Sequence, residues 1–332
     1  MRRFPLAGAL ALAAVPLTAG AAFATPAYNL RVEAPGATID PGTHYSVRDP
    51  IGAQRGETPS SGNCVRAPGD LSIGGRTALG LAASAADASA ALRPLFVVED
   101  SFGRRICRIA GFNETDSPFT GWLFRVNHAA PPMSAELVPI QTTDEVLWVF
   151  ANFGTGANTG DELVLTGPFR STPGAVQVSV AAISYEGVRG PAPDGTMITG
   201  GSTPVPTAGG VATVPVATST TLRAVGPGPA PTEIPSNELP LCVAANLEEC
   251  PQVPGRRIVG TNLRDAFKGG GGPDQIRTRG GKDKVRVLGG GIDRVDCGTG
   301  KDVVIADRTD RTKNCEKVRR SAKGKKKGKT KK

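Results

Sequence analysis

Five aspartates recur near the carboxyl end of the chain at intervals of nine or ten residues: Asp265, Asp274, Asp283, Asp293 and Asp302. Glycines precede them, and an apolar residue follows each by two positions. Ca²⁺ takes about six to eight oxygen ligands from carboxylates and backbone carbonyls, and glycine lets carbonyls approach an ion closely. The spacing therefore predicts glycine-rich turns that stack and bind calcium between them.

This repeat resembles the nonapeptide G-G-x-G-x-D-x-U-x of haemolysin-type, repeats-in-toxin proteins. Residues 269–277 match every fixed position, and the other copies match in part. The resemblance implies a parallel β-roll over residues 251–316 in which turns share calcium ions. Its ligands would be the five aspartates and the carbonyls of the turn glycines, namely Gly270, Gly272, Gly281, Gly291, Gly298 and Gly300.

Basic residues surround these turns and weaken the expected affinity. Residues 256–316 hold 14 basic and nine acidic side chains, and nearby positive charge disfavours a divalent cation. We expect weak binding, in the range of about 10⁻⁴–10⁻³ M that is typical of extracellular modules. The alternative is a metal-free roll held by packing and by a Cys297–Cys315 bridge.

The cysteines and the amino terminus both indicate export. The spacing of the six cysteines suggests three local pairs, Cys64–Cys107, Cys242–Cys250 and Cys297–Cys315, although about 15 connectivities are open to six cysteines. Disulfides persist in oxidising compartments. Residues 1–24 begin with two arginines, continue with an apolar run and end at Ala22-Phe23-Ala24, which is typical of a cleaved signal peptide. We expect an extracellular or cell-surface protein without a membrane span after cleavage.

The net charge of +9 belongs to the carboxyl-terminal tail. Residues 317–332 carry ten basic and no acidic residues. They lack apolar periodicity, so we expect them to be disordered. One interpretation is a solvated tail; the other is attachment to an acidic cell-wall polymer or another anionic surface. Nucleic acid is not the expected partner, because the protein is predicted to be exported and no aromatic residues alternate with the lysines.

Residues 25–168 are expected to form an α+β domain. Residues 77–93 predict a helix that Pro94 ends. Residues 121–127 and 145–150 predict strands with Trp122 and Trp148 in the core, and the second strand is apolar on both faces, as a central strand is. The T-A-L helix start and the two tryptophan strands resemble a domain of unknown function related to the C-terminal domain of transcobalamin, which implies a β-grasp-like fold. Corrinoid binding does not carry over, because no partner domain is visible.

Residues 169–250 alternate apolar and polar positions between frequent turns, which predicts short strands. Residues 194–196 and 209–214 resemble a bacterial immunoglobulin-like β-sandwich, with a disordered linker as the alternative. The fold class expected overall is therefore multi-domain and mainly β.

No catalytic motif is present: there is no G-x-S-x-G, no H-E-x-x-H and no phosphate-binding loop. His44 and His128 are the only histidines, and His128 is expected to lie unpaired in a turn. The first hypothesis is a non-enzymatic, secreted binding protein. The alternatives are a secreted enzyme that uses the first domain as a substrate platform, and a purely structural wall component.

Overall fold

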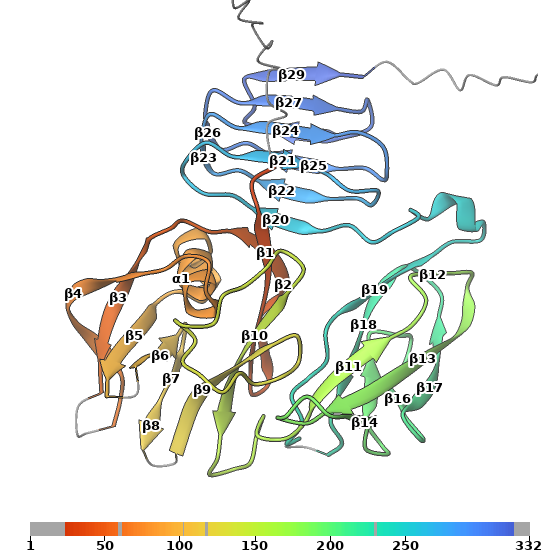
Figure 1. Ribbon diagram of the computed structural model, residues 1–332. Coiled ribbons are helices and arrows are strands. Elements are labelled where there is room, and N and C mark those ends of the chain that lie inside the picture. The colour runs from red at the N-terminus through yellow and green to blue at the C-terminus, as the bar shows by residue number, and fades with distance from the viewer. Residues whose placement is uncertain (1–23, 59–61, 102, 117–118, 229–230, 322–332) are drawn as a thin grey trace, which may run out of the picture.

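Short β-strands and one α-helix make up the part of the chain that the computed structural model describes, residues 24–58, 62–101, 103–116, 119–228 and 231–321. The mainly-β, multi-unit fold class is confirmed, with three separate apolar cores. Figure 1 shows the three units: an N-terminal unit, a sandwich beside it and a roll stacked on the N-terminal unit. The predicted signal peptide, apart from Ala24, and residues 322–332 of the tail lie outside the described residues.

The N-terminal unit contains two sheets and a helix. Its first sheet has the order β2-β1-β10-β9-β8, with bounds Ala37–Ser46, Ala27–Ala34, Glu145–Asn152, Phe119–Val126 and Thr115–Asp116. The second sheet has the order β4-β3-β5-β6-β7, with bounds Val65–Ile73, Ile51–Glu57, Leu95–Asp100, Gly103–Ile109 and Phe112–Asn113. Helix α1, Ala78–Ala88, contributes most of its residues to the shared core.

The helix and the tryptophan strands lie where the sequence predicts them. The Thr77 hydroxyl accepts a hydrogen bond from the Gly80 amide at 3.0 Å, which caps α1. The helix ends earlier than predicted, and a 3₁₀ turn, Ala90–Leu92, completes the segment before Pro94. β10 lies between β1 and β9 and is buried on both faces. Trp148 is buried, and its indole N–H donates to the carbonyl of Ala78, so it is a core residue.

The second unit is a two-layered sandwich. One sheet contains β11, β13, β14 and β17, with bounds Glu162–Thr166, Gly174–Ile183, Arg189–Pro191 and Val211–Val216. The other has the order β12-β19-β18-β15-β16, with bounds Arg170–Ser171, Leu239–Val243, Thr220–Val225, Met197–Thr199 and Val205–Pro206. The predicted boundary after residue 168 is wrong, because β11 already pairs with β13 of the sandwich. Leu163 and Leu165 of β11 are buried in the sandwich core, and this burial draws the strand into the second unit.

The third unit is a parallel roll of two main sheets and a short pair, β23 with β26, whose bounds are Gly280–Gly281 and Thr299–Gly300. The first sheet of the roll contains β20, β22, β25 and β28, with bounds Arg257–Val259, Gln275–Arg277, Arg294–Asp296 and Arg311–Lys313. The second contains β21, β24, β27 and β29, with bounds Ala266–Lys268, Lys284–Val287, Val303–Ala306 and Lys317–Arg320. Successive strands alternate between the two sheets, so one coil comprises two copies of the repeat. The apolar residue two places after each aspartate is buried between the sheets.

The roll is longer than predicted. Residues 317–320, assigned from the sequence to a disordered tail, form β29 and pair in parallel with β27. Their backbone groups complete the ladder of the last coil, although their side chains are exposed. The high charge that suggested disorder therefore lies on the outside of a strand.

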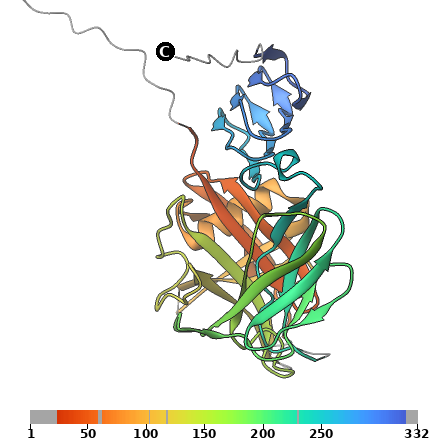
Figure 2. The same cartoon turned by 90° about the vertical axis from the view of Figure 1, so that its right-hand side faces the viewer.

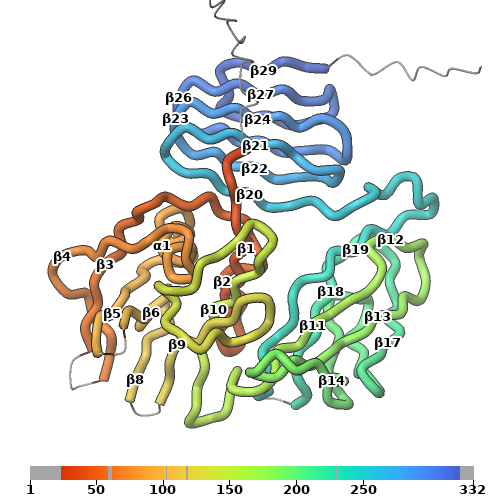
Figure 3. The backbone as a smooth tube through the Cα atoms, in the orientation of Figure 1, coloured from red at the N-terminus to blue at the C-terminus, as the bar shows by residue number. Residues whose placement is uncertain are grey.

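The first sheet of the N-terminal unit continues into the roll. β2 pairs in parallel with β20, with His44 opposite Ile258 and Tyr45 opposite Val259, so nine strands form one sheet. Near the amino end, the Thr25 amide donates to the carbonyl of Ala266, and the Ala266 amide donates to the Thr25 hydroxyl. Figures 2 and 3 show the coils rising from this junction.

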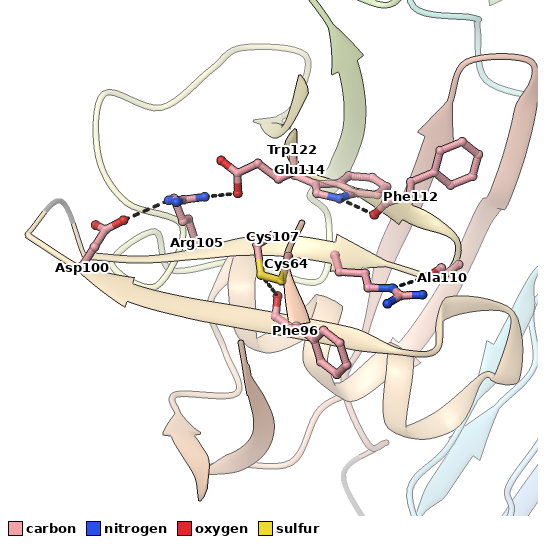
Figure 4. The surroundings of a disulfide bond; sticks show 10 residues. Cys64, Phe96, Asp100, Arg105, Cys107, Ala110, Phe112, Glu114 and Trp122 are labelled. Carbon is pink, nitrogen blue, oxygen red and sulfur yellow. Dashed lines mark hydrogen bonds and ion pairs between the residues drawn. A yellow bond between two sulfur atoms is a disulfide. The ribbon is translucent and has the colours of Figure 1, made fainter. Parts of the chain in front are cut away.

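The three predicted cysteine pairs are all present as disulfides, Cys64–Cys107, Cys242–Cys250 and Cys297–Cys315. Cys64 and Cys107 are buried in a small cluster with Phe96 and Val98, and Figure 4 shows this bridge beside β5 and β6. Cys297 and Cys315 are 18 residues apart, so their bridge fastens the last coil of the roll to the one before it.

Candidate functional site

The five predicted aspartates are buried in the roll, and each immediately precedes a strand. They do not form one group. Asp274 and Asp293 precede strands of the first sheet of the roll, and we call their stack the first column. Asp265, Asp283 and Asp302 precede strands of the second sheet, and we call theirs the second column.

Within each column, a carboxylate accepts a hydrogen bond from the backbone amide of the acidic residue one coil earlier. In the first column, the Asp274 amide donates to Asp293 Oδ1 at 2.7 Å. In the second, the Asp265 amide donates to Asp283 Oδ1, and the Asp283 amide donates to Asp302 Oδ1, each at 2.8 Å. Such bonds satisfy buried N–H groups that the two sheets leave unpaired at the turns. The aspartates therefore hold the coils together whether or not a metal is bound.

Two acidic residues that the sequence reasoning missed complete the columns. Asp310 Oδ1 accepts from the Asp293 amide at 3.1 Å, and Glu316 Oε2 accepts from the Asp302 amide at 2.8 Å. A partial signal was present for Glu316, because the apolar Val318 follows it by two positions as in the repeat, whereas the polar Thr312 follows Asp310. Their shorter spacings of eight and six residues concealed them.

The turn glycines allow the coils to stack closely. Gly298 has a φ of +75°, and a Cβ there would overlap the carbonyl of Arg279 one coil earlier. A Cβ on Gly300 would likewise overlap the carbonyl of Gly281. A larger residue at either position would force adjacent turns apart. Gly270, Gly272 and Gly291 lie in the turns beside the first column, and Gly281 lies beside the second.

The second column retains oxygen atoms without hydrogen bonds. Oδ2 of Asp283 and Oδ2 of Asp302 are both buried and lack a partner among the described residues. Burial raises the pKa of Asp283, and the neighbouring carboxylates of Asp265 and Asp302 add to that rise. Stacked, partly unsatisfied carboxylates of this kind are a fitting donor set for a hard cation such as Ca²⁺.

In the first column, no carboxylate oxygen of Asp274 or Asp293 is both buried and without a hydrogen-bond partner among the described residues. Asp274 Oδ2 accepts from the Gly270 amide and lies 3.6 Å from the Arg256 guanidinium. Burial raises the pKa of Asp293 to about 6, and the carboxylates of Asp310, Asp274 and Asp307 act in the same direction. Because Arg256 already supplies positive charge at the base of this column, the electrostatic attraction for a cation is weaker there.

A second cluster of charged residues joins the N-terminal unit to the sandwich. Glu162 of β11 is fully buried and pairs with Arg31 of β1, while the Arg125 guanidinium lies 3.9 Å from it. His128 Nδ1 lies 3.0 Å from Glu162 Oε1. The expectation of an unpaired turn histidine is therefore wrong, because folding places β11 of the next unit against this turn.

The ligand atoms of His128, Glu145 and Glu162 lie within 4.8 Å of one another, which is close enough for a metal ion. Arg31 and Arg125 nevertheless neutralise the two carboxylates. The pKa of His128 is raised, chiefly by its hydrogen bond to Glu162, whereas a metal ligand must be deprotonated. We therefore assign this cluster to ion pairing between the units.

Two further carboxylates, Glu33 and Asp40, line hollows and have raised pKa values because of burial. Glu33 pairs with Arg223 of the sandwich at 2.6 Å. Asp40 accepts from the Tyr45 hydroxyl at 2.6 Å and from the amides of Gly42 and Thr43. Each carboxylate is thus engaged by structural partners rather than directed at an open site.

Comparison of the chain with protein-family models, with curated proteins and with solved structures found no match. Within the described residues, no helix is long and apolar enough to cross a membrane.

Proposed function

We propose that the protein is a non-enzymatic, extracellular binding protein whose roll takes up calcium weakly in the second column. The observation that carries this proposal is the pair of buried, unpartnered oxygens on Asp283 and Asp302. Calcium would be held by these carboxylates and by carbonyls of the adjacent glycine turns. It would supply positive charge that offsets the repulsion between stacked acids.

The hydrogen-bonded columns imply that the roll folds without calcium and that bound calcium stabilises it further. Each carboxylate in the stack already accepts a backbone amide from the neighbouring coil. Lys282 and Lys301 are exposed in the same turns and oppose a cation. Both features favour weak binding, in the range of about 10⁻⁴–10⁻³ M.

An extracellular location is supported by the three disulfides, which are stable in oxidising surroundings. A non-enzymatic role is supported by the structural contacts of Glu33, of Asp40 and of His128 with Glu162. The three units would then act as a rigid support that displays binding surfaces.

The test is chemical denaturation of the chelator-treated full chain with added CaCl₂ or MgCl₂. At a calcium concentration ten times Kd, linkage predicts a stabilisation of about 1.4 kcal/mol. Asp283→Asn with Asp302→Asn should abolish the calcium effect, since asparagine keeps an acceptor for the ladder but removes the charge. Asp293→Asn, in the first column, is the matched control and should retain it.

Equal stabilisation by magnesium and calcium, or no shift at about 10 mM calcium, would contradict the calcium site. The roll would then be the metal-free scaffold that the sequence left open. Loss of the effect in the Asp293→Asn control alone would move the site to the first column.

A further inference from the structure

The outer face of the first sheet of the roll carries a row of basic side chains. Arg294 of β25 lies directly opposite Arg311 of β28 in register, and Arg277 and Lys313 belong to the neighbouring column of the same face. All four side chains are exposed, and none has an ion-pair partner among the described residues. We call Arg277, Arg294, Arg311 and Lys313 the basic strip.

This arrangement is unfavourable in the free protein. Like charges that face one another on adjacent strands destabilise a sheet, and here Arg294 and Arg311 do so without an acid between them. Asp296, the acidic residue of the face, accepts instead from the Gly298 amide and from the Asn314 side chain. An anionic ligand bridging the strip would remove the repulsion.

The strip lies in a groove. A hollow of about 260 Å³ is lined by the four basic residues together with Gln275 and with one acid, Asp296, which lies between Arg277 and Lys313 in register. Gln275 and Arg277 also line a hollow of about 370 Å³ at the junction with the N-terminal unit. Gln275 and Arg257 line a third, of about 310 Å³, which reaches the sandwich. Gln275 lines all three hollows, so they adjoin one another along the stacking axis of the coils.

We propose that this groove binds a linear acidic polysaccharide through the carboxylates that the polymer carries at regular intervals. The backbones of adjacent strands are about 4.8 Å apart, so Arg294 and Arg311 project from neighbouring positions along the groove, and guanidinium pairs well with carboxylate. The exposed Gln275 lies between Arg257 and Arg294 in register, and its amide can hydrogen-bond sugar hydroxyls. No aromatic side chain lines the strip, whereas single-stranded nucleic acid is usually held by base stacking on aromatic residues.

The opposite face of the roll is a natural comparison. Lys284 and Arg286 of β24 are exposed there, but in register they lie opposite Val303 and Ile305 of β27. On its other side, Arg286 lies opposite Lys268 of β21, and Lys284 lies opposite Ala266. This face has similar charge, but neither Lys284 nor Arg286 lines the hollow beside the strip, so it separates the effect of net charge from that of position.

The test measures binding of the purified full chain to a labelled polyuronate, in chelator, at low and moderate salt. Arg294→Glu with Arg311→Glu should weaken binding by more than about tenfold. Lys284→Glu with Arg286→Glu, which makes the same change in net charge on the other face, should change it by less than about twofold. Arg294→Gln with Arg311→Gln guards against misfolding and should give an intermediate loss.

Equal losses in both charge-reversal variants would overturn the proposal, because net charge alone would then explain binding. Loss of binding on removal of residues 322–332, with the strip intact, would assign binding to the tail instead. Tighter binding of single-stranded DNA than of polyuronate would show that the polymer class is wrong. The proposal rests on the extracellular role but not on calcium, and the chelator keeps the two tests separate.

Discussion

At the scale of single residues, one of the contacts that join the first two units is a buried charge cluster. Glu162 is fully buried and receives Arg31 and His128. Removing one partner of a buried pair leaves an uncompensated charge, which costs more than the pair itself contributes. The cluster therefore fixes the position of the sandwich against the N-terminal unit.

His128 should make this contact sensitive to pH. Its pKa is raised above the ordinary value, mainly by the hydrogen bond to Glu162, with Glu145 acting in the same direction and Arg31 against it. Protonated His128 thus stabilises the folded state fully below about pH 6.5, and this contribution is lost as the pH rises through the folded pKa. We expect the free energy of unfolding to fall as the pH rises from about 6.5 through the folded pKa of His128. Urea denaturation at several pH values should show a smaller fall for His128→Gln than for the wild type.

The only other histidine supplies the control. The pKa of His44 is lowered by burial, so His44→Gln should leave the fall at rising pH in place. A pH profile of His128→Gln that matches the wild type would show that the hydrogen bond to Glu162 has no energetic role.

At the scale of elements, the roll is built from short strands that have little stability alone. β25 and β28 each span three residues. The acidic columns, the apolar core and the disulfide Cys297–Cys315 hold them in register. The bridge spans 18 residues, which corresponds to one coil.

Replacing Cys297 and Cys315 with serine should destabilise the last coil by about 3 kcal/mol in the chain-entropy model. Hydrogen exchange should accelerate in β28 and β29 while β1 and β10 remain protected. The matched control replaces Cys242 and Cys250, which close a loop at the edge of the sandwich, and should leave β28 and β29 unchanged. Uniform acceleration throughout the chain would contradict a local role for the bridge.

At the scale of the whole molecule, the N-terminal unit and the roll share one sheet. The pairing of β2 with β20 covers the edge of the first coil, and the Thr25 segment pairs with Ala266. An uncovered sheet edge exposes unpaired N–H and C=O groups and promotes association. The roll therefore depends on the unit below it.

An isolated roll of residues 251–321 should consequently be unstable. Circular dichroism should show little strand signal, or light scattering should show aggregation, under conditions in which the full chain is folded and monodisperse. A folded, monomeric fragment with a cooperative unfolding transition would show that the shared sheet is dispensable.

Much of the local structure was predictable from the amino-acid sequence. The nine-residue period specified the roll, because an aspartate at each turn and an apolar residue two places later match the geometry of stacked coils. The helix that starts near Thr77, the central strand around Trp148 and the three cysteine pairs were also predicted, since the helix and the strand follow from local apolar patterns and the cysteines fall into three groups along the chain.

Only the tertiary structure decided the relations between distant segments. Glu162 reaches His128 and Arg31, β2 continues into β20, and Arg294 lies opposite Arg311 because long-range packing and strand register bring them together. The division of the aspartates into two columns has the same origin: one coil contains two repeats, so alternate copies enter different sheets. Periodicity along the chain specifies which residues face inward, whereas register between strands determines which of them meet.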